Sequence, residues 1–278
     1  MKIEQRFPAE TDREAAIGVF DSGIGGLTVV KALMERLPFE HIHYFGDTAR
    51  VPYGIKSVQT IQSFSAQIAD FLLERRVKML VVACNTMAAV AGDLIKKRSG
   101  VPVLDVIAAG ADAAVAATRK RAIGIIGTPT TINSNAYARA IHALDGQVRV
   151  YSQACPLFVP LVEEGWLDHP VTRLTAEEYL KPVFVESVDT LVLGCTHYPL
   201  LKPLLQDVVG GSMHLIDSAL TVAEEAARLL QSNGMENTSR QTPEYRFFVT
   251  DIPLRFQALG SRFLGRDLPL VQTVSLPG

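Results

Sequence analysis

Residues 79–86 read MLVVACNT, an apolar strand-like run that ends in a thiol and two small polar residues. A second stretch far along the chain, LVLGCTH at residues 191–197, has the same form, with Cys195 in the place of Cys84. Apolar runs of this length are typical of strands buried in a parallel sheet, and the polar residues after them suit a turn or a helix N-terminus. The two stretches therefore predict two matched strand ends that each carry one cysteine.

The rest of the chain alternates between such runs and amphipathic stretches. Strand candidates lie at residues 17–20, 41–45, 79–83 and 101–106, and helix candidates lie at residues 26–37, 58–75 and 87–97. In the tail we expect a helix at residues 219–230, a strand at 246–250 and a helix at 253–263. This alternation predicts an α/β protein with a parallel sheet covered by helices.

The pattern begins again near the middle of the chain. IGIIGT at residues 123–128 echoes IGVFDS at residues 17–22, and the pairs Tyr44/Tyr151 and Cys84/Cys195 follow at nearly the same offset. Any doubly wound protein repeats strand-turn-helix units, so chance echoes are the alternative explanation. We interpret the echoes as two similar doubly wound parallel-sheet domains related by a pseudo-two-fold, with the active site between them. The predicted division is a polar N-terminal extension at 1–16, a first domain at 17–107 plus 216–278, and a second domain at 108–215.

The bulk composition excludes several classes of function. The chain has 278 residues, of which 48% are hydrophobic and 20% charged, and its net charge is −2. This balance is that of a soluble globular protein and gives no basis for binding nucleic acid. No apolar stretch is long enough to cross a membrane, and the polar start of the chain does not resemble a secretory signal. Three scattered cysteines argue against a disulfide framework and favour a reducing, cytoplasmic location.

Two thiols in matched settings suit one acid and one base that face each other across a substrate, as proton exchange at a carbon atom requires. A lone buried cysteine is more often a small hydrophobe, and Cys155, which precedes a proline, is interpreted as structural. A metal site is disfavoured because Cys195-x-His197 lacks a second pair of ligands. A redox dithiol is disfavoured because the chain has no C-x-x-C sequence.

Two further motifs follow predicted strands. DSGIGG at residues 21–26 has glycines that allow close approach of the backbone, before a helix N-terminus that favours an anion. It is not a Rossmann motif, because Thr28 stands where the third glycine belongs, and the chain has no Walker A sequence. GTPTTINSN at residues 127–135 offers neutral hydroxyl donors for an anion. Taken singly, Asp21 could cap the helix, His197 could be a satisfied core histidine and Glu163 a surface carboxylate.

Several long motifs in order resemble the glutamate racemase family. They are DSGIGGL at 21–27, GDTARVPYG at 46–54, ACNT at 83–86 and GCTHYPL at 194–200, joined by Gly127, Thr128, Thr131, Ser134 and Tyr137. The resemblance runs from residue 17 to about residue 203 and is weaker in the tail. Met87 is a departure, because the family more often has alanine at this position.

The resemblance implies a cofactor-independent racemase, without a metal, that interconverts L- and D-glutamate and supplies D-glutamate for peptidoglycan biosynthesis. It implies that Cys84 takes the α-proton from D-glutamate and Cys195 takes it from L-glutamate. The residues that assist the thiols would be Asp21, Glu163 and His197. The residues that bind the substrate would be Asp21, Ser22, Tyr53, Gly54, Asn85, Thr86, Thr128, Thr196 and His197. A homodimer is usual in the family, and some relatives with N-terminal extensions are controlled by a peptidoglycan precursor.

Other functions remain open at this point. An aspartate racemase of the same superfamily usually carries an acidic residue near the second cysteine, where this chain has His197 and Tyr198. A non-enzymatic two-lobed protein that binds small anions would have no reason to place one cysteine in each half. A metal-dependent enzyme would lose its activity when a chelator is added.

Overall fold

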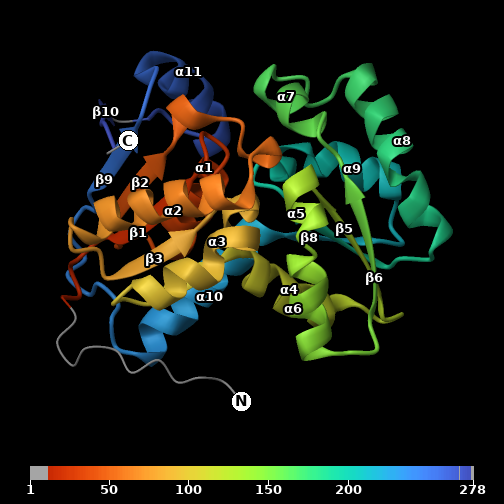
Figure 1. The fold of residues 1–278 in the computed structure, drawn as a ribbon, viewed down its shortest axis with the longest axis horizontal. Helices are drawn as coiled ribbons and strands as arrows, with labels where there is room; N and C mark the ends of the chain where they lie inside the picture. The colour runs from red at the N-terminus through yellow and green to blue at the C-terminus, as the bar shows by residue number, and fades with distance from the viewer. Residues whose placement is uncertain (1–11, 269, 277–278) are drawn as a thin grey trace.

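The computed structural model describes residues 12–268 and 270–276. It contains two parallel β-sheets that lie side by side, each with helices packed around it (Figure 1). The first sheet has the strand order β10-β9-β2-β1-β3-β4 and the second has the order β6-β5-β7-β8. The strands are β1 (Ile17–Asp21), β2 (Ile42–Gly46), β3 (Met79–Val82), β4 (Val103–Asp105), β5 (Ala122–Gly127), β6 (Arg149–Ala154), β7 (Thr190–Gly194), β8 (His214–Asp217), β9 (Tyr245–Val249) and β10 (Val271–Thr273).

Helices connect most of these strands. The α-helices are α1 (Leu27–Arg36), α2 (Val58–Leu73), α3 (Asn85–Arg98), α4 (Val106–Ala117), α5 (Pro129–Asn133), α6 (Ala136–Leu144), α7 (Phe158–Glu163), α8 (Pro170–Val185), α9 (Lys202–Val209), α10 (Ser218–Ser232) and α11 (Pro253–Leu264). Three short 3₁₀ helices are η1 (Thr48–Arg50), η2 (Tyr53–Ile55) and η3 (Tyr198–Leu201). None of the helices that the structure describes is both long enough and apolar enough to cross a membrane.

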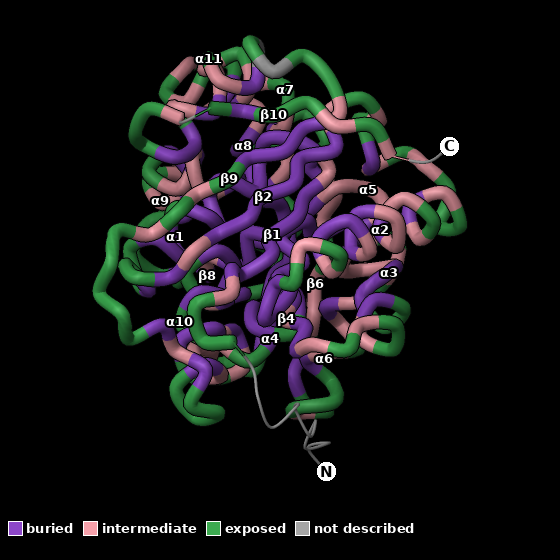
Figure 2. Tube along the Cα trace, turned by 90° about the vertical axis from the view of Figure 1, so that its left-hand side faces the viewer, coloured by how far each residue is buried: buried purple, intermediate pink, exposed green. Residues whose placement is uncertain are grey.

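The inner strands of both sheets are buried along their whole length. All residues of β1, β3, β5 and β7 are inaccessible or nearly so, and Figure 2 shows β1 in the interior with exposed segments around it. A parallel sheet has both faces covered, so its strands need apolar side chains at every position rather than at alternate ones. This requirement makes the strands visible in the sequence, and the prediction of an α/β fold with parallel sheets is confirmed.

The two sheets repeat one arrangement of strands. The order β2-β1-β3-β4 in the first sheet matches β6-β5-β7-β8 in the second, and the strand pairs in both are parallel. Cys84 follows β3 and Cys195 follows β7, which hold the same place in their sheets. The echoes in the sequence therefore correspond to equivalent strands.

The C-terminal tail returns to the first sheet, where β9 pairs with β2 and β10 pairs with β9. The exact domain limits stay a prediction: the point between 107 and 108 lies inside α4, and the point between 215 and 216 lies inside β8. Of the expected polar extension, residues 1–11 lie outside the described residues. Of the remainder, residues 12–14 are exposed, whereas Ala16 is buried beside β1.

The predicted ends of most elements differ from the observed ones by one or two residues, and two of these differences have a clear local cause. The helix expected from Met87 begins two residues earlier at Asn85, because Cys84 is extended (φ −72°, ψ 119°) and ends the strand segment itself. The strand expected at 101–106 is shorter because Asp105 caps the next helix, accepting hydrogen bonds from the backbone N–H groups of Ile107 and Ala108. Both polar residues after Cys84 therefore belong to the first turn of α3.

Candidate active site

A cavity of about 450 Å³ lies between the two sheets, at the carboxyl ends of their strands. Ser22 follows β1 and Thr128 follows β5, just as the two cysteines follow β3 and β7. The predicted site residues that line the cavity are Ser22, Tyr53, Gly54, Cys84, Asn85, Thr86, Thr128, Glu163, Cys195, Thr196 and His197. In open α/β sheets ligands bind at this edge, so the strand ends bring residues from distant segments to one place.

The first thiol lies at the start of a helix. Cys84 is the N-cap residue of α3 and is 5% exposed, and its Sγ donates to the Ser22 Oγ at 3.5 Å. Burial, together with the negative charge of Asp21, raises the pKa of the Cys84 thiol to about 11. Met87, the residue that departs from the family pattern, is fully buried in the core behind this thiol.

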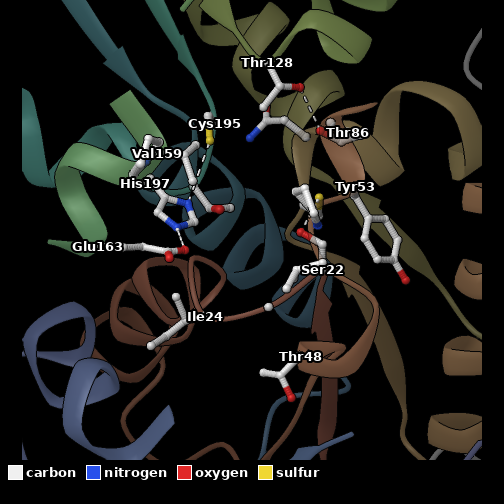
Figure 3. Close-up of a pocket in the computed structure, with 18 of the residues that line it drawn as sticks. Ser22, Ile24, Thr48, Tyr53, Thr86, Thr128, Val159, Glu163, Cys195 and His197 are labelled. Carbon is white, nitrogen blue, oxygen red and sulfur yellow. Dashed lines mark hydrogen bonds and ion pairs between the residues drawn. The ribbon is translucent and has the colours of Figure 1, made fainter. Parts of the chain in front are cut away.

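The second thiol lies beside an imidazole. Cys195 Sγ is 3.9 Å from His197 Nδ1, and His197 Nε2 is 3.1 Å from Glu163 Oε1. Figure 3 shows His197 between Cys195 and Glu163 on one side of the cavity, with Ser22 and Tyr53 on the other. Burial raises the pKa of the Cys195 thiol well above its ordinary value. The three side chains therefore link the buried thiol to a partly exposed carboxylate through an imidazole, a group that can carry a proton.

The residues that follow Cys195 require glycine at position 25. A Cβ atom at Gly25 would lie 2.2 Å from Thr196 Oγ1 and 2.6 Å from His197 Nδ1. Only glycine lets the loop after β1 approach the Cys195 segment so closely. The glycine-rich motif therefore serves contact between the two halves of the site.

Asp21 lies behind the cavity and contacts both halves. Its carboxylate is 1% exposed and accepts hydrogen bonds from the backbone N–H of Gly23 at 2.9 Å and from Thr196 Oγ1 at 3.5 Å. Burial raises its pKa, and the nearby His197 acts in the opposite direction. Thr28, which occupies the third-glycine position of the absent Rossmann motif, donates to the Thr196 carbonyl at 3.0 Å. Asp21 and Thr28 thus hold the Cys195 segment against the first sheet.

The hydroxyl-bearing residues Thr86 and Thr128 line another part of the cavity. Thr86 Oγ1 is 2.9 Å from Thr128 Oγ1 (Figure 3) and 3.3 Å from Thr131 Oγ1, and the last two atoms are 3.0 Å apart. Thr130 Oγ1 donates to the Gly54 carbonyl at 2.7 Å. Thr131 matches the family pattern in sequence, but its place in this triangle is visible only in the structure.

The oxygen of the Asn85 amide has a hydrogen-bond partner, and the nitrogen has none among the described residues. Tyr137 donates its hydroxyl hydrogen to Asn85 Oδ1 at 2.7 Å. Asn85 Nδ2 is buried and finds no hydrogen-bond partner within the described part of the chain. A buried donor without a partner is costly, and Asn85 lines the cavity, so its NH₂ group is a candidate donor to an acceptor of a ligand.

Tyr53 contributes differently from the other predicted binding residues. It lines the cavity, but its hydroxyl donates to Asp47 Oδ2, and Figure 3 shows the hydroxyl pointing away from Ser22. The fully buried Asp47 also accepts from Arg50 Nε at 2.6 Å and from Thr250 Oγ1 at 2.9 Å. Tyr53 therefore presents its ring to the cavity, while Asp47, which was not singled out in the sequence, fixes the loop.

The remaining wall is apolar and comes partly from the tail. Phe256 and Leu259 of α11 line the cavity together with Val159 and Pro160 of α7. No lysine or arginine occurs among the described residues that line it. The described residues also contain no cluster of three His, Cys, Asp or Glu side chains suited to a metal ion. The polar side chains among the described residues that line the cavity are thus two thiols, several hydroxyls, the amide of Asn85, the imidazole of His197 and the carboxylates of Glu163 and Asp251.

Residues 17–226 match the Asp/Glu/Hydantoin racemase family. Glutamate racemase from Syntrophus aciditrophicus is 68% identical over 260 residues, which cover 94% of this chain and 96% of that protein. The solved structure of glutamate racemase from Francisella tularensis in complex with D-glutamate is 45% identical, with a TM-score of 0.89 over 95% of this chain and 98% of that one. Escherichia coli glutamate racemase, solved with L-glutamate and the activator UDP-MurNAc-Ala, is 25% identical, with a TM-score of 0.77 over 95% and 100%.

These matches agree with the motifs at the cavity and extend beyond them into the tail, because the similarity covers nearly the whole of each chain. The chain therefore belongs to the Asp/Glu/Hydantoin racemase family, in its glutamate racemase branch, and is an amino-acid racemase, an isomerase.

Proposed function

We propose that this chain interconverts L- and D-glutamate by acid/base proton transfer between two cysteines and the α-carbon, without a cofactor. The observation that carries the proposal is that Cys84 and Cys195 line one cavity from the ends of equivalent strands. The relative from Francisella tularensis, solved with D-glutamate, supports glutamate as the substrate.

Each turnover moves one proton on each face of the α-carbon. In the L-to-D direction the Cys195 thiolate takes the α-proton, an S–H bond forms, and the electron pair of the broken C–H bond spreads from the α-carbon into the carboxylate. The Cys84 thiol then gives its proton to the opposite face, which forms the new C–H bond and leaves Cys84 as a thiolate. The D-to-L direction uses the same steps with the two thiols exchanged.

The transition state gathers negative charge on the α-carboxylate, and donors aimed at it stabilise that charge. Asn85, Thr86 and Thr128 supply neutral donors, and the N-terminus of α3 adds its backbone polarity. Because no lysine or arginine lines the described cavity, the ammonium group of the substrate is the main positive charge available. It offsets the high thiol pKa and favours the thiolate that must act as base.

The neighbours of the thiols have assisting roles in this scheme. His197 is the group placed to accept the proton of Cys195 when that thiol becomes the base, and Glu163 stabilises the resulting imidazolium. Asp21 contacts the Cys195 segment through Thr196 and raises the pKa of Cys84, so it affects both thiols. These residues act through the cysteines.

Incubation with L-glutamate in D₂O, without added cofactor, tests the mechanism. Two bases on opposite faces predict that deuterium appears at the α-carbon mainly in the D-product at early times. Deuterium mainly in the recovered L-substrate would show a single shared base instead. The same reaction with a chelator present is expected to run at an unchanged rate.

Assays of L-glutamate and L-aspartate side by side test the substrate. We expect turnover of glutamate, because the second cysteine is followed by His197 and Tyr198 rather than by an acidic residue. Activity on aspartate alone would replace this proposal with an aspartate racemase, and no turnover of either would favour a protein that only binds anions.

Further parts of the proposal concern the setting of the enzyme. We propose a cytoplasmic homodimer whose D-glutamate is used for peptidoglycan, which complementation of a D-glutamate-requiring bacterium and light scattering in solution would test. The complex of the Escherichia coli relative with UDP-MurNAc-Ala suggests a regulator of the same kind here. Addition of that compound to the assay would raise the rate if such control operates and leave it unchanged otherwise.

A further inference from the structure

Tyr137 joins the two cysteine segments behind the cavity. Its hydroxyl donates to Asn85 Oδ1 at 2.7 Å, and Asn85 directly follows Cys84. Its ring lies against Gly194, which directly precedes Cys195, because a Cβ atom there would be 3.2 Å from Tyr137 Cε2. Tyr137 comes from α6 and Asn85 from α3, so this contact spans elements that belong to different halves of the fold.

The hydrogen bond decides which end of the Asn85 amide is left without a partner in the part of the chain that the structure describes. An asparagine amide has an acceptor end and a donor end, and it can turn over by rotation. Tyr137 is 2% exposed, and burial keeps the pKa of its hydroxyl far above neutrality, so the group stays a donor. The Val106 carbonyl, a second acceptor for this hydroxyl, is 3.4 Å away, which is a weaker contact, and the Ser218 side chain also interacts with the hydroxyl. The bond to Oδ1 therefore leaves Nδ2 without a partner among the described residues.

The NH₂ group of Asn85 is a hydrogen-bond donor without an acceptor in the described structure. Asn85 is 2% exposed and lines the cavity, and its Nδ2 has no partner within the described residues. With the amide turned over, Oδ1 would take the place of Nδ2, and this acceptor would repel a carboxylate bound next to it. The energetic advantage of the correct orientation therefore appears when a carboxylate is bound.

We propose that Tyr137 is a positioning residue that fixes the Asn85 amide with its NH₂ group toward the substrate carboxylate, and so ties carboxylate recognition to contact between the two halves of the fold. This inference rests on the proposed function, since it takes a dicarboxylate as the ligand. It assigns no bond-making or bond-breaking step to Tyr137.

Binding of glutarate provides a measurement that does not depend on racemisation. Glutarate has the carbon chain and both carboxylates of the substrate but no amino group. In Tyr137→Phe, which removes only the hydroxyl, we expect the dissociation constant from calorimetry to rise about tenfold. We expect KM for both enantiomers of glutamate to rise by a similar factor, with kcat changed about threefold or less, because the lost contact is made in the ground state as well.

A double-mutant cycle separates positioning from a general structural effect. In an Asn85→Ala background there is no amide to orient, so Asn85→Ala/Tyr137→Phe should bind glutarate as Asn85→Ala alone does. Tyr179→Phe is the matched control, because that tyrosine also loses a hydrogen-bonded hydroxyl, which accepts from the Leu157 N–H at 3.3 Å outside the cavity. Wild-type glutarate binding in a folded Tyr137→Phe protein, or equal losses with and without Asn85, would overturn the inference.

Gly110→Ala supplies a second variant that keeps the hydroxyl. A Cβ atom at Gly110 on α4 would lie 3.2 Å from Tyr137 Oη and from Cε1, and the next nearest atom is Tyr137 Cζ at 3.7 Å. The ring must shift by a few tenths of an ångström, which distorts a 2.7 Å hydrogen bond in whichever direction it moves. We expect weaker glutarate binding in a protein that still unfolds cooperatively on heating, since the better helix propensity of alanine offsets part of the cost of the close contact.

The two proposals fail in different ways. If the wild-type enzyme did not racemise glutamate but the glutarate measurements behaved as described, the proposed reaction would be wrong and the positioning role would stand. If racemisation occurred and glutarate bound equally well to wild type, Tyr137→Phe and Gly110→Ala, only the positioning role would fail.

Discussion

The two cysteine segments end equivalent strands but create different surroundings for their thiols. After Cys84 the helix α3 begins at the next residue, and the thiol donates to the hydroxyl of Ser22. After Cys195 the chain makes a turn and the short helix η3 before α9 begins, and the thiol lies beside His197. One thiol therefore has the positive end of a long helix, whereas the other has an imidazole paired with a carboxylate.

The difference teaches how a repeated fold becomes an asymmetric site. Burial raises the pKa of both thiols, so each needs help to become a base. A helix N-terminus and an imidazole both favour a thiolate, but only the imidazole can also carry the proton. The strand plan is shared, and the residues after the strand decide how the thiolate is reached.

Removal of either thiol is expected to have the largest effect. Cys84→Ala and Cys195→Ala should each lower racemisation about 10³-fold or more, because each deletes a proton donor and acceptor on one face of the α-carbon. Polarimetry in both directions measures this loss, and thermal unfolding checks the fold. Cys155→Ala, which removes a buried thiol outside the cavity, is the matched control and should keep its activity. Wild-type turnover in Cys84→Ala or Cys195→Ala would contradict the proposal that both thiols exchange a proton with the α-carbon.

Alkaline stability should distinguish the protein with and without the first thiol. The Cys84 pKa rises from 9.0 to about 11 in the fold, so burial favours the protonated thiol, and this contribution is complete below pH 9. It is lost as the pH rises through 11, at a cost of about 3 kcal/mol in the free energy of unfolding. Urea unfolding at pH 8 and pH 11 should therefore show a steeper loss for wild type than for Cys84→Ala. Equal losses of stability in the two proteins would mean that the fold does not raise the pKa of Cys84.

His197→Asn should weaken the second thiol selectively. We expect kcat/KM to fall about 10²-fold, and by the same factor in both directions, because the two enantiomers have equal free energies. The asymmetry should appear in the isotope effect: proton removal by Cys195 becomes slower, so L-[2-²H]glutamate should show a larger effect than D-[2-²H]glutamate. Glu163→Gln should change the two isotope effects in the same sense but less. Equal isotope effects would place His197 with both thiols.

Ser22→Ala tests the first thiol in the same way and should have the smallest effect. It removes one neutral hydrogen bond to Cys84, so kcat/KM should fall about fivefold. The larger isotope effect should now occur with D-[2-²H]glutamate, the opposite of the His197 variant. The same ordering of isotope effects in both variants would contradict the separate neighbours described above.

Prediction from sequence was most successful where burial required an apolar residue at every position. The strands β1, β3, β5 and β7 are buried on both faces, so the chain has to be apolar along them. Helix α8 carried no comparable signal. Its buried positions are Thr172, Ala176, Leu180 and Val183, two of which are not strongly apolar, while Leu174 on the same helix is 65% exposed. Its amphipathic pattern is correspondingly weak.

The residues around the thiols follow the same division. The motifs contain ten of the predicted site residues that line the cavity, from Ser22 to His197, because each lies within a recognisable run of sequence. Phe256 and Leu259 were not singled out, and Asp47 was given no role although it lies in the motif at 46–54. Asp47 meets Thr250 across more than two hundred residues, and the other two lie in a helix of the weakly similar tail. Such contacts leave no periodicity and no local spacing in the sequence.

The sequence by itself determined the parallel α/β sheets, the matched strand ends and the two cysteines placed on them, because burial and chain geometry act on neighbouring residues. The tertiary structure alone decided the orientation of the polar groups around those cysteines. It turned the Tyr53 hydroxyl toward Asp47 and paired the Asn85 carbonyl oxygen with the hydroxyl of Tyr137. The reason is that a buried donor or acceptor must find its partner wherever the fold brings one within reach, regardless of distance along the chain.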